Sequence, residues 1–254
     1  MSSSEVPRGL VGSSIARSDA SSIHIHGLDL CNDLIGGVTI TDFLALELRG
    51  ELPGAAERRL LDAFMVTLAE HGTTPSTIAA RLTMLGSPDQ LQSAVASGLL
   101  GAGSRFLGSM SDCARLLQDP RVTEHRAPSD RAASLIEIAN GSVPGIGHPL
   151  HKPEDPRSVK LFALARELDA YGPACETIVA VRQTLHERTG TRLPINATGA
   201  IAAIATDIGY EWQAVRGFAL VARTVGILGH LTEERRAPMG QQIWDLVEGL
   251  GDDD

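Results

Sequence analysis

A glycine-rich turn in the middle of the chain carries the residue types best suited to chemistry. Segment 145–149 reads Gly-Ile-Gly-His-Pro, and its glycines let the backbone approach a ligand closely. His148 stands in this turn, and Lys152, Arg157 and Lys160 follow it. An imidazole beside local positive charge suits an anionic substrate. The alternative is an ordinary Gly/Pro loop before a helix, and composition alone does not separate the two.

A second candidate is Arg223, which lies inside the apolar segment 218–228. A charge within such a helix is costly unless it is paired. Its partner is either an internal carboxylate or the carboxylate of a ligand, which a guanidinium binds through two hydrogen bonds. Gly226 and Gly229 follow on the same helix and would let another helix approach closely.

The remaining histidines give weaker signals. His71 follows Glu70 at the end of a predicted helix, where a lone histidine is more often structural than functional. His24 and His26 alternate along a predicted strand without a third ligand, so we expect an exposed strand face and no metal site. The sequence after His230 is not the HExxH of zinc enzymes, and GxSxG, GxGxxG and P-loop motifs are absent.

Composition narrows the protein class. The chain has 254 residues, 43% hydrophobic and 4% aromatic, with a net charge of −9. A core of Leu, Ile, Val and Ala favours helices, in one large domain or two small ones. The negative charge argues against nucleic-acid binding, and three scattered cysteines against a disulfide scaffold. Segment 217–231 contains Arg223 and is shorter than the roughly 20 residues a bilayer requires, so we expect a cytoplasmic protein without membrane contact.

Helical spacing of apolar residues dominates the chain and predicts an all-α fold of roughly ten helices. Thr74 before Pro75 and Ser87 before Pro88 are predicted helix starts. Residues 22–27 alternate polar and apolar, which predicts a short N-terminal β element. Helices are expected over 39–48, 55–70, from 75, 91–100, 112–118, 131–139, 156–171, 173–189, 199–208 and 212–234, before an amphipathic and then acidic tail from 241. The β-rich runs of a Rossmann fold or a barrel are absent.

Five segments, in order along the chain, resemble the citrate synthase superfamily. The resemblance is closest to short citryl-CoA lyase-like proteins and to the C-terminal lyase module of ATP-citrate lyase. It includes Glu-His-Gly-Thr-Thr-Pro-Ser from residue 70, Gly-Ile-Gly-His-Pro-Leu-His-Lys from 145 and Val-Ala-Arg-Thr-Val-Gly from 221. The five segments are 70–81, 96–103, 145–157, 193–203 and 221–234. Each alone is weak, but together they are specific and cover about residues 22–240.

The resemblance implies an all-α, citrate synthase-like homodimer, or a tetramer, whose subunits each have a large and a small helical domain. The large domain would comprise residues 22–106 and 224–254, and the small domain residues 107–223, after an N-terminal arm at 1–21. Ligand would bind in the cleft between the domains.

The family makes or breaks a carbon–carbon bond between an acyl-CoA enolate and a keto acid such as oxaloacetate. The resemblance therefore implies an acyl-CoA thioester as substrate, a dicarboxylate as its partner, and no permanently bound cofactor. His148 matches the histidine that polarises the keto or hydroxyl oxygen. The matches to dicarboxylate-binding residues are His71, Arg157 and Arg223. The matches to the segment that contacts coenzyme A are Gly145, Ile146, Gly147 and Lys152.

Two positions depart from the family pattern. Thr198 stands where the family has the Asp of an Asn-x-Asp-Gly segment, the acid/base at the thioester methyl. A threonine hydroxyl has no useful pKa for abstracting that α-proton near pH 7. Phe106 is the nearest match to the histidine that stabilises the enolate in citrate synthase, which the lyase module also lacks.

Three interpretations follow from Thr198. The first is a citryl-CoA lyase-like enzyme, because cleavage forms the enolate without deprotonating carbon and leaves only its protonation unassisted. The second is an enzyme on another acyl-CoA, which generates the carbanion by decarboxylation. The third is a catalytically weak relative that binds coenzyme A and a dicarboxylate. Glu70 and Asp207 are candidate substitute acids, although Asp207 is better suited to a local cap or pair.

Overall fold

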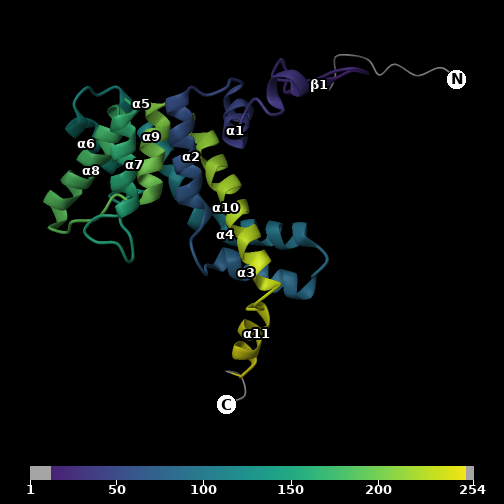
Figure 1. Cartoon of the computed structure of the whole chain (residues 1–254). Coiled ribbons are helices and arrows are strands. Elements are labelled where there is room, and N and C mark those ends of the chain that lie inside the picture. The colour runs from purple at the N-terminus through teal and green to yellow at the C-terminus, as the bar shows by residue number, and fades with distance from the viewer. Residues whose placement is uncertain (1–12, 250–254) are drawn as a thin grey trace. The chain divides into compact units, whose positions relative to one another are not determined.

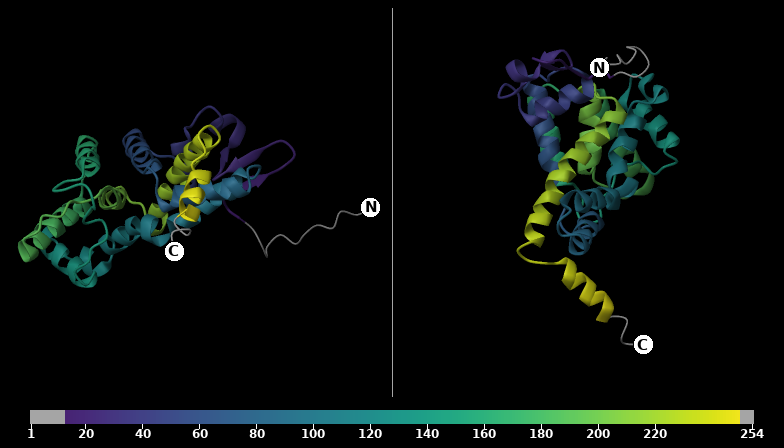
Figure 2. Two further views of the ribbon diagram at one scale, coloured as in Figure 1. Left: turned by 90° about the horizontal axis from the view of Figure 1, so that it is seen from below. Right: turned by 90° about the vertical axis from the view of Figure 1, so that its right-hand side faces the viewer.

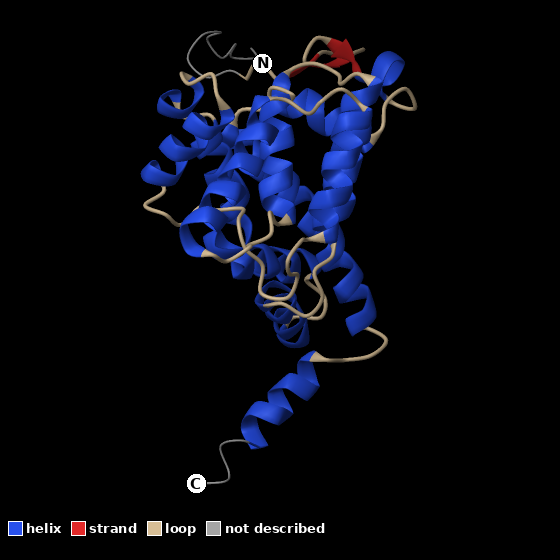
Figure 3. Ribbon diagram, turned by 90° about the vertical axis from the view of Figure 1, so that its left-hand side faces the viewer, coloured by secondary structure: helices blue, strands red, loops and turns tan. Residues whose placement is uncertain are grey.

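The computed structural model describes residues 13–249, except for the side chains of Arg105 and Phe106. This part of the chain is mostly helical, with one small sheet near its N-terminal end (Figure 3). The all-α fold with a short N-terminal β element is thereby confirmed. The chain divides into two compact units between Leu61 and Asp62. The large and small domains expected from the resemblance stay a prediction.

The first unit contains the sheet and the first helix. Its antiparallel strands, in the order β1-β2-β3, are β1 (Ala16–Ser18), β2 (Ile23–Ile25) and β3 (Leu28–Asp29). A π-helix (Leu30–Leu34) follows, and then α1 (Ile40–Arg49), which begins with a capping box between Thr39 and Asp42. β2 fulfils the strand expectation, whereas β1 lies in the expected arm and was missed because its residues are all exposed.

His24 and His26 do not share a strand face as expected. His24 is in β2, but His26 adopts a left-handed conformation with φ 48° in the turn that follows. Among residues 13–249, no group of three or more His, Cys, Asp or Glu side chains is placed to hold a metal ion.

Helix α2 (Ala55–Ala69) crosses the boundary between the units, and the helices from α3 onward belong to the second unit. Within that unit α4 contacts α3 and α10 along part of its length and α9 along another (Figures 1 and 2). Helix α9 also contacts α7 and α8, and α11 contacts α3. The helices are α3 (Pro75–Gly86), α4 (Leu91–Leu117), α5 (Pro120–Thr123), α6 (Pro128–Ile138), α7 (Pro156–Glu167), α8 (Pro173–Thr189), α9 (Ala197–Asp207), α10 (Trp212–Glu234) and α11 (Gly240–Gly249).

Helix α4 covers the two helices expected at 91–100 and 112–118, and a kink at Gly103, whose φ of 54° and ψ of −164° are non-helical, divides it. The segment around this kink is rich in small residues. The small residues serve close packing: a Cβ on Gly98 would lie 2.8 Å from Ile227 Cδ1, and one on Gly101 would lie 3.0 Å from Ala79 Cβ. Two corrections are that Ser87 ends α3 instead of starting α4, and that a further short helix, α5, lies between the helices expected at 112–118 and 131–139.

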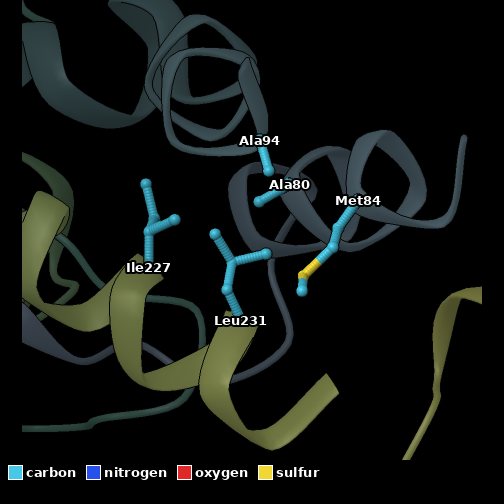
Figure 4. Packing of buried hydrophobic residues seen from close by; sticks show 5 residues of the cluster. All are labelled: Ala80, Met84, Ala94, Ile227 and Leu231. Carbon is cyan, nitrogen blue, oxygen red and sulfur yellow. The ribbon is translucent and has the colours of Figure 1, made fainter. Parts of the chain in front are cut away.

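Buried apolar side chains fix α10 against α3 and α4. Ala80 and Met84 on α3, Ala94 on α4, and Ile227 and Leu231 on α10 point toward one another (Figure 4). Full burial of a side chain the size of leucine contributes about 1.5–3 kcal/mol. These contacts hold in place the helix that carries Arg223.

Helix α10 is long and apolar enough, by length and composition alone, to cross a membrane. A core helix of a globular protein satisfies the same criterion. Here α10 packs against α3 and α4, and Arg223, in the middle of the helix, is buried.

Candidate active site

One pocket of about 320 Å³ in the second unit gathers most of the predicted site residues. It is bounded by the end of α2, the middle of α4, the 147–149 turn, the first turns of α7 and α9, and the middle of α10. The predicted residues that line it are His71, Gly147, His148, Arg157, Thr198 and Arg223. Gly145, Ile146 and Lys152 are not part of its lining.

His148 is held with one nitrogen toward the backbone and the other toward Arg157. Its Nδ1 accepts hydrogen bonds from the backbone nitrogens of Leu150 (3.1 Å) and His151 (3.0 Å). In the neutral ring the hydrogen therefore sits on Nε2. Burial lowers the pKa of His148, and the charges of nearby His151 and Arg157 lower it further, so the ring is neutral at pH 7. His148 thus presents an N–H donor.

Arg157 aims a second donor at the same place. Its Nη2 lies 3.3 Å from His148 Nε2, and since both atoms carry hydrogen, the pair is suited to share an acceptor oxygen from a ligand. Asp155, which is fully buried, fixes the guanidinium through Nε (3.0 Å) and Nη2 (2.8 Å). The same carboxylate caps α7 and accepts from the backbone nitrogen of Ala197 at 3.2 Å. Asp155 therefore ties together the starts of α7 and α9.

Arg223 is buried, with 7% of its surface exposed. Its Nη1 has no hydrogen-bond partner, and no carboxylate among the described residues forms an ion pair with it. Burial lowers its pKa, opposed by the charge of Glu70. The internal salt bridge considered from the sequence is therefore absent from residues 13–249, and this cation faces the pocket. An anionic ligand group would satisfy it.

His71 lies in the turn after α2 and lines the same pocket. Burial lowers its pKa, and the positive charges of Arg223 and Arg157 lower it further. All three side chains line the pocket, and the charge of Glu70, which also lines it, acts on the His71 pKa in the opposite direction to the two guanidinium groups. A dicarboxylate has the charge that this arrangement lacks.

The wall formed by Thr198 is uncharged. Its hydroxyl donates to Asn196 Oδ1 (2.7 Å), so that the Ser109 hydroxyl, 3.3 Å away on α4, is the donor toward Thr198. Asn196 caps α9 by accepting from the backbone nitrogen of Gly199 (3.0 Å). Leu107 and Met110 are buried beside them. This wall offers hydroxyl groups and no carboxylate.

The glycine turn is bound to the strand-like segment before α9. Gly147 donates to Pro194 O (2.7 Å), and the backbone nitrogen of Asn196 donates to Gly145 O (3.0 Å). A Cβ on Gly145 would lie 2.6 Å from Gly199 Cα, at a φ of 91°. Only glycine fits there, so Gly145 and Ile146 anchor the turn behind the pocket surface.

Several contributing residues were not singled out from the sequence. Ser109 gave no signal, because a serine within a helical pattern is unremarkable. Asp155 was not recognised as a site residue, because an aspartate directly before a helix is a common cap. Asp207 is a cap, as expected, since it accepts from the backbone nitrogens of Gly172 (2.9 Å), Ala174 (2.8 Å) and Cys175 (3.0 Å) at the start of α8. Phe106 lies outside the described side chains.

Comparison with known proteins identifies the family of this chain. The family model described as the C-terminal domain of citrate synthase matches residues 31–244. The chain belongs to the citrate synthase family. Citryl-CoA lyase from Hydrogenobacter thermophilus has a similar structure, with a TM-score of 0.81 and 33% sequence identity, over 89% of this chain and 87% of that one.

More distant members share the fold or part of the sequence. ATP citrate lyase from Methanosaeta concilii, solved with (3S)-citryl-CoA, has a TM-score of 0.72 at 20% identity, over 91% of this chain and 40% of that chain. The putative citrate synthase 2 of Mycobacterium tuberculosis is 29% identical over 78% of this chain and 53% of its own length. The chain thus spans about half the length of that curated citrate synthase relative.

Proposed function

We propose that the protein is a carbon–carbon lyase that cleaves citryl-CoA, or a closely related acyl-CoA, into acetyl-CoA and oxaloacetate. The observation that carries this proposal is the pair of donors on His148 and Arg157, which point at one place beside the unpaired cation of Arg223. The likeness to the Hydrogenobacter citryl-CoA lyase supports the same chemistry.

The geometry fits the cleavage direction. His148 Nε2–H and Arg157 Nη2–H stabilise the alkoxide formed when the tertiary hydroxyl of the citryl group loses its proton to water. Arg223 and His71 bind the carboxylates of the same group. As the carbon–carbon bond breaks, the alkoxide becomes the keto group of oxaloacetate, and the bonding electron pair forms the enolate of acetyl-CoA. A proton from water then converts the enolate to the methyl group, which balances the proton lost at the start.

Thr198 is compatible with this direction and poorly suited to the reverse. Condensation requires a base to remove a proton from the acetyl methyl group, and the hydroxyls of Thr198 and Ser109 have no suitable pKa. Cleavage requires only that the enolate be protonated. We therefore place the coenzyme A thioester as a substrate beside Thr198, reached along the turn of Gly147, with Lys152 near its phosphates.

The test is mass spectrometry of citryl-CoA incubated with the purified protein, following acetyl-CoA and oxaloacetate. We expect cleavage by the wild type and its abolition by His148→Ala. His186→Ala on α8, outside the pocket lining, is the matched control and should retain activity. If a folded wild type does not cleave citryl-CoA, this substrate is wrong, and another acyl-CoA or a purely binding role takes its place.

We further propose that the protein acts as a homodimer. Support comes from the outward side of α10, where Leu220, Val225 and Leu228 are exposed to 38%, 59% and 39%. Apolar side chains grouped in this way are typical of a surface covered by a partner. Sedimentation of the wild type should give the mass of two chains, and Val225→Asp should give the mass of one. A wild type that sediments as a single chain would refute the dimer.

A further inference from the structure

The turn that carries His71 is organised by one carboxylate oxygen. Glu70 Oε1 accepts hydrogen bonds from the backbone nitrogens of His71 (2.8 Å) and Gly72 (2.6 Å). It also accepts from Nε2 of His230, on α10, at 2.9 Å. Burial raises the pKa of Glu70, but these hydrogen bonds outweigh it and leave the pKa below its usual range. Glu70 is therefore an anchored anion and a poor substitute for the missing acid.

His230 is held from its other side by Arg81. Arg81 Nη2 lies 2.8 Å from His230 Nδ1, and since a guanidinium only donates, Nδ1 must accept. The ring hydrogen therefore sits on Nε2, directed at Glu70. Arg81 is fully buried on α3, and its charge is balanced by Glu234, 2.7 Å from Nη1, and by Glu233. The direction of the hydrogen bond to Glu70 is thus fixed by Arg81.

The same face of α10 contacts both the turn and the pocket. Arg223, Gly226 and His230 recur at helical spacing along it. A Cβ on Gly226 would lie 1.9 Å from the carbonyl oxygen of Ala69, so the backbone of α10 touches the end of α2 there. The close approach expected at Gly226 is confirmed, whereas nothing lies within 4 Å of a Cβ on Gly229. The cation that faces the ligand and the ring that holds Glu70 are thereby kept in a fixed relation.

We propose that His230, oriented by Arg81, is a positioning residue, which fixes the 70–72 turn through Glu70 and so holds His71 against the dicarboxylate. The proposal rests on the proposed function for the identity of the ligand. The order of the turn itself does not depend on which ligand binds. Of the residues in this chain of contacts only Glu70 and His71 line the pocket, so His230 acts through them.

Two substitutions at His230 separate positioning from general stability. His230→Leu removes both hydrogen bonds and keeps a similar volume. His230→Gln keeps one acceptor and one donor at a spacing close to that of the two ring nitrogens. We expect His230→Leu to raise KM for citryl-CoA and the Kd for oxaloacetate about tenfold, typical of losing one charge-assisted hydrogen bond, with kcat less affected. His230→Gln should keep KM and Kd close to the wild-type values.

Amide hydrogen exchange measured by NMR provides a readout that needs no substrate. The backbone amides of His71 and Gly72 donate to Glu70, so His230→Leu should accelerate their exchange about tenfold, and His230→Gln should not. Glu70→Ala, at an exposed side chain, should accelerate both amides even if His230→Leu folds poorly. His186→Leu on α8 is the control for removing a half-buried imidazole and should leave both amides unchanged.

The outcomes are distinct. The positioning role is overturned if the amides of His71 and Gly72 exchange at the same rate in the wild type, His230→Leu and Glu70→Ala. It is also overturned if His230→Gln loses as much affinity for oxaloacetate as His230→Leu. If the wild type neither binds oxaloacetate nor cleaves citryl-CoA, but the amides respond as expected, the proposed function fails and the positioning of the turn stands.

Discussion

The two walls of the pocket differ in charge. One wall carries Arg157 and Arg223 with the neutral donors of His71 and His148, and an unpaired guanidinium nitrogen is buried there. The other carries the hydroxyls of Thr198 and Ser109 beside buried apolar side chains. The first wall gathers the four residues that the resemblance matches to ligand binding, and the second has a threonine where the resemblance leads us to expect a carboxylate.

This difference assigns ligand binding to the charged wall and bears on proton abstraction from carbon at the uncharged wall. A buried cation without a partner costs folding free energy, so the presence of Arg223 is best explained by an anionic ligand. A hydroxyl pair in place of a carboxylate removes the base that enolisation requires, and leaves bond cleavage possible. The pocket thus fits the proposed function, in which a dicarboxylate group is held on one wall and an enolate is released at the other.

The largest expected effect is a gain of enolisation in Thr198→Asp. A carboxylate at this place would accept the methyl proton of acetyl-CoA, and a placed base contributes about 100-fold or more. The measurement is deuterium incorporation into the acetyl methyl group, followed by NMR in D₂O with oxaloacetate present. Thr198→Asn is the matched control, since it adds a similar volume without a base. Equal incorporation in the wild type and both variants would show that Thr198 does not face the methyl group.

Arg223→Met should have a smaller effect, weakening the binding of oxaloacetate while increasing the stability of the protein. Losing a guanidinium that binds a carboxylate should weaken oxaloacetate affinity about 30-fold or more, as for other buried charge pairs. Removing a buried cation without an internal partner should also raise the free energy of unfolding by about 1 kcal/mol. Calorimetric titration and urea unfolding measure the two quantities. A variant that binds normally would place the dicarboxylate elsewhere.

The sequence predicts the charged wall better than the uncharged one. His148 and Arg223 stand out because histidine in a glycine turn and arginine in an apolar helix are unusual combinations, whereas Arg157 was assigned to the site through the resemblance. The place of Ser109 beside Thr198 could not be predicted, because it depends on the packing of α4 against α9. The close contacts of Gly98 and Gly101 could not be predicted either, since small residues at a helix contact and in a loop have the same composition.

The pH dependence of binding offers a more modest test of the charged wall. The pKa values of His71 and His148 lie below their usual range, so both rings are neutral at pH 7 in the free protein. A bound dianion raises these pKa values, and the complex then takes up protons. Affinity for oxaloacetate should therefore rise a few-fold as the pH falls from about 7.5 to about 6.

Titration calorimetry in two buffers of different ionisation enthalpy measures this proton uptake. His71→Asn should reduce the uptake, because the substituted side chain does not titrate. If the affinity for oxaloacetate decreased as the pH was lowered over the same range, this would contradict a pair of neutral histidines facing the ligand.

The smallest expected effect lies on the uncharged wall, at Ser109. Its hydroxyl donates to Thr198 Oγ1 across a long 3.3 Å contact, while Thr198 donates to Asn196 Oδ1 at 2.7 Å. Ser109→Ala therefore removes a weak neutral hydrogen bond worth about 0.5–1 kcal/mol and leaves the Asn196 cap of α9 in place. Cleavage of citryl-CoA should fall by no more than about fivefold, with little change in oxaloacetate affinity. A loss as large as that of His148→Ala would mean that the Ser109 hydroxyl itself delivers the proton to the enolate, and the uncharged wall would then be the catalytic one.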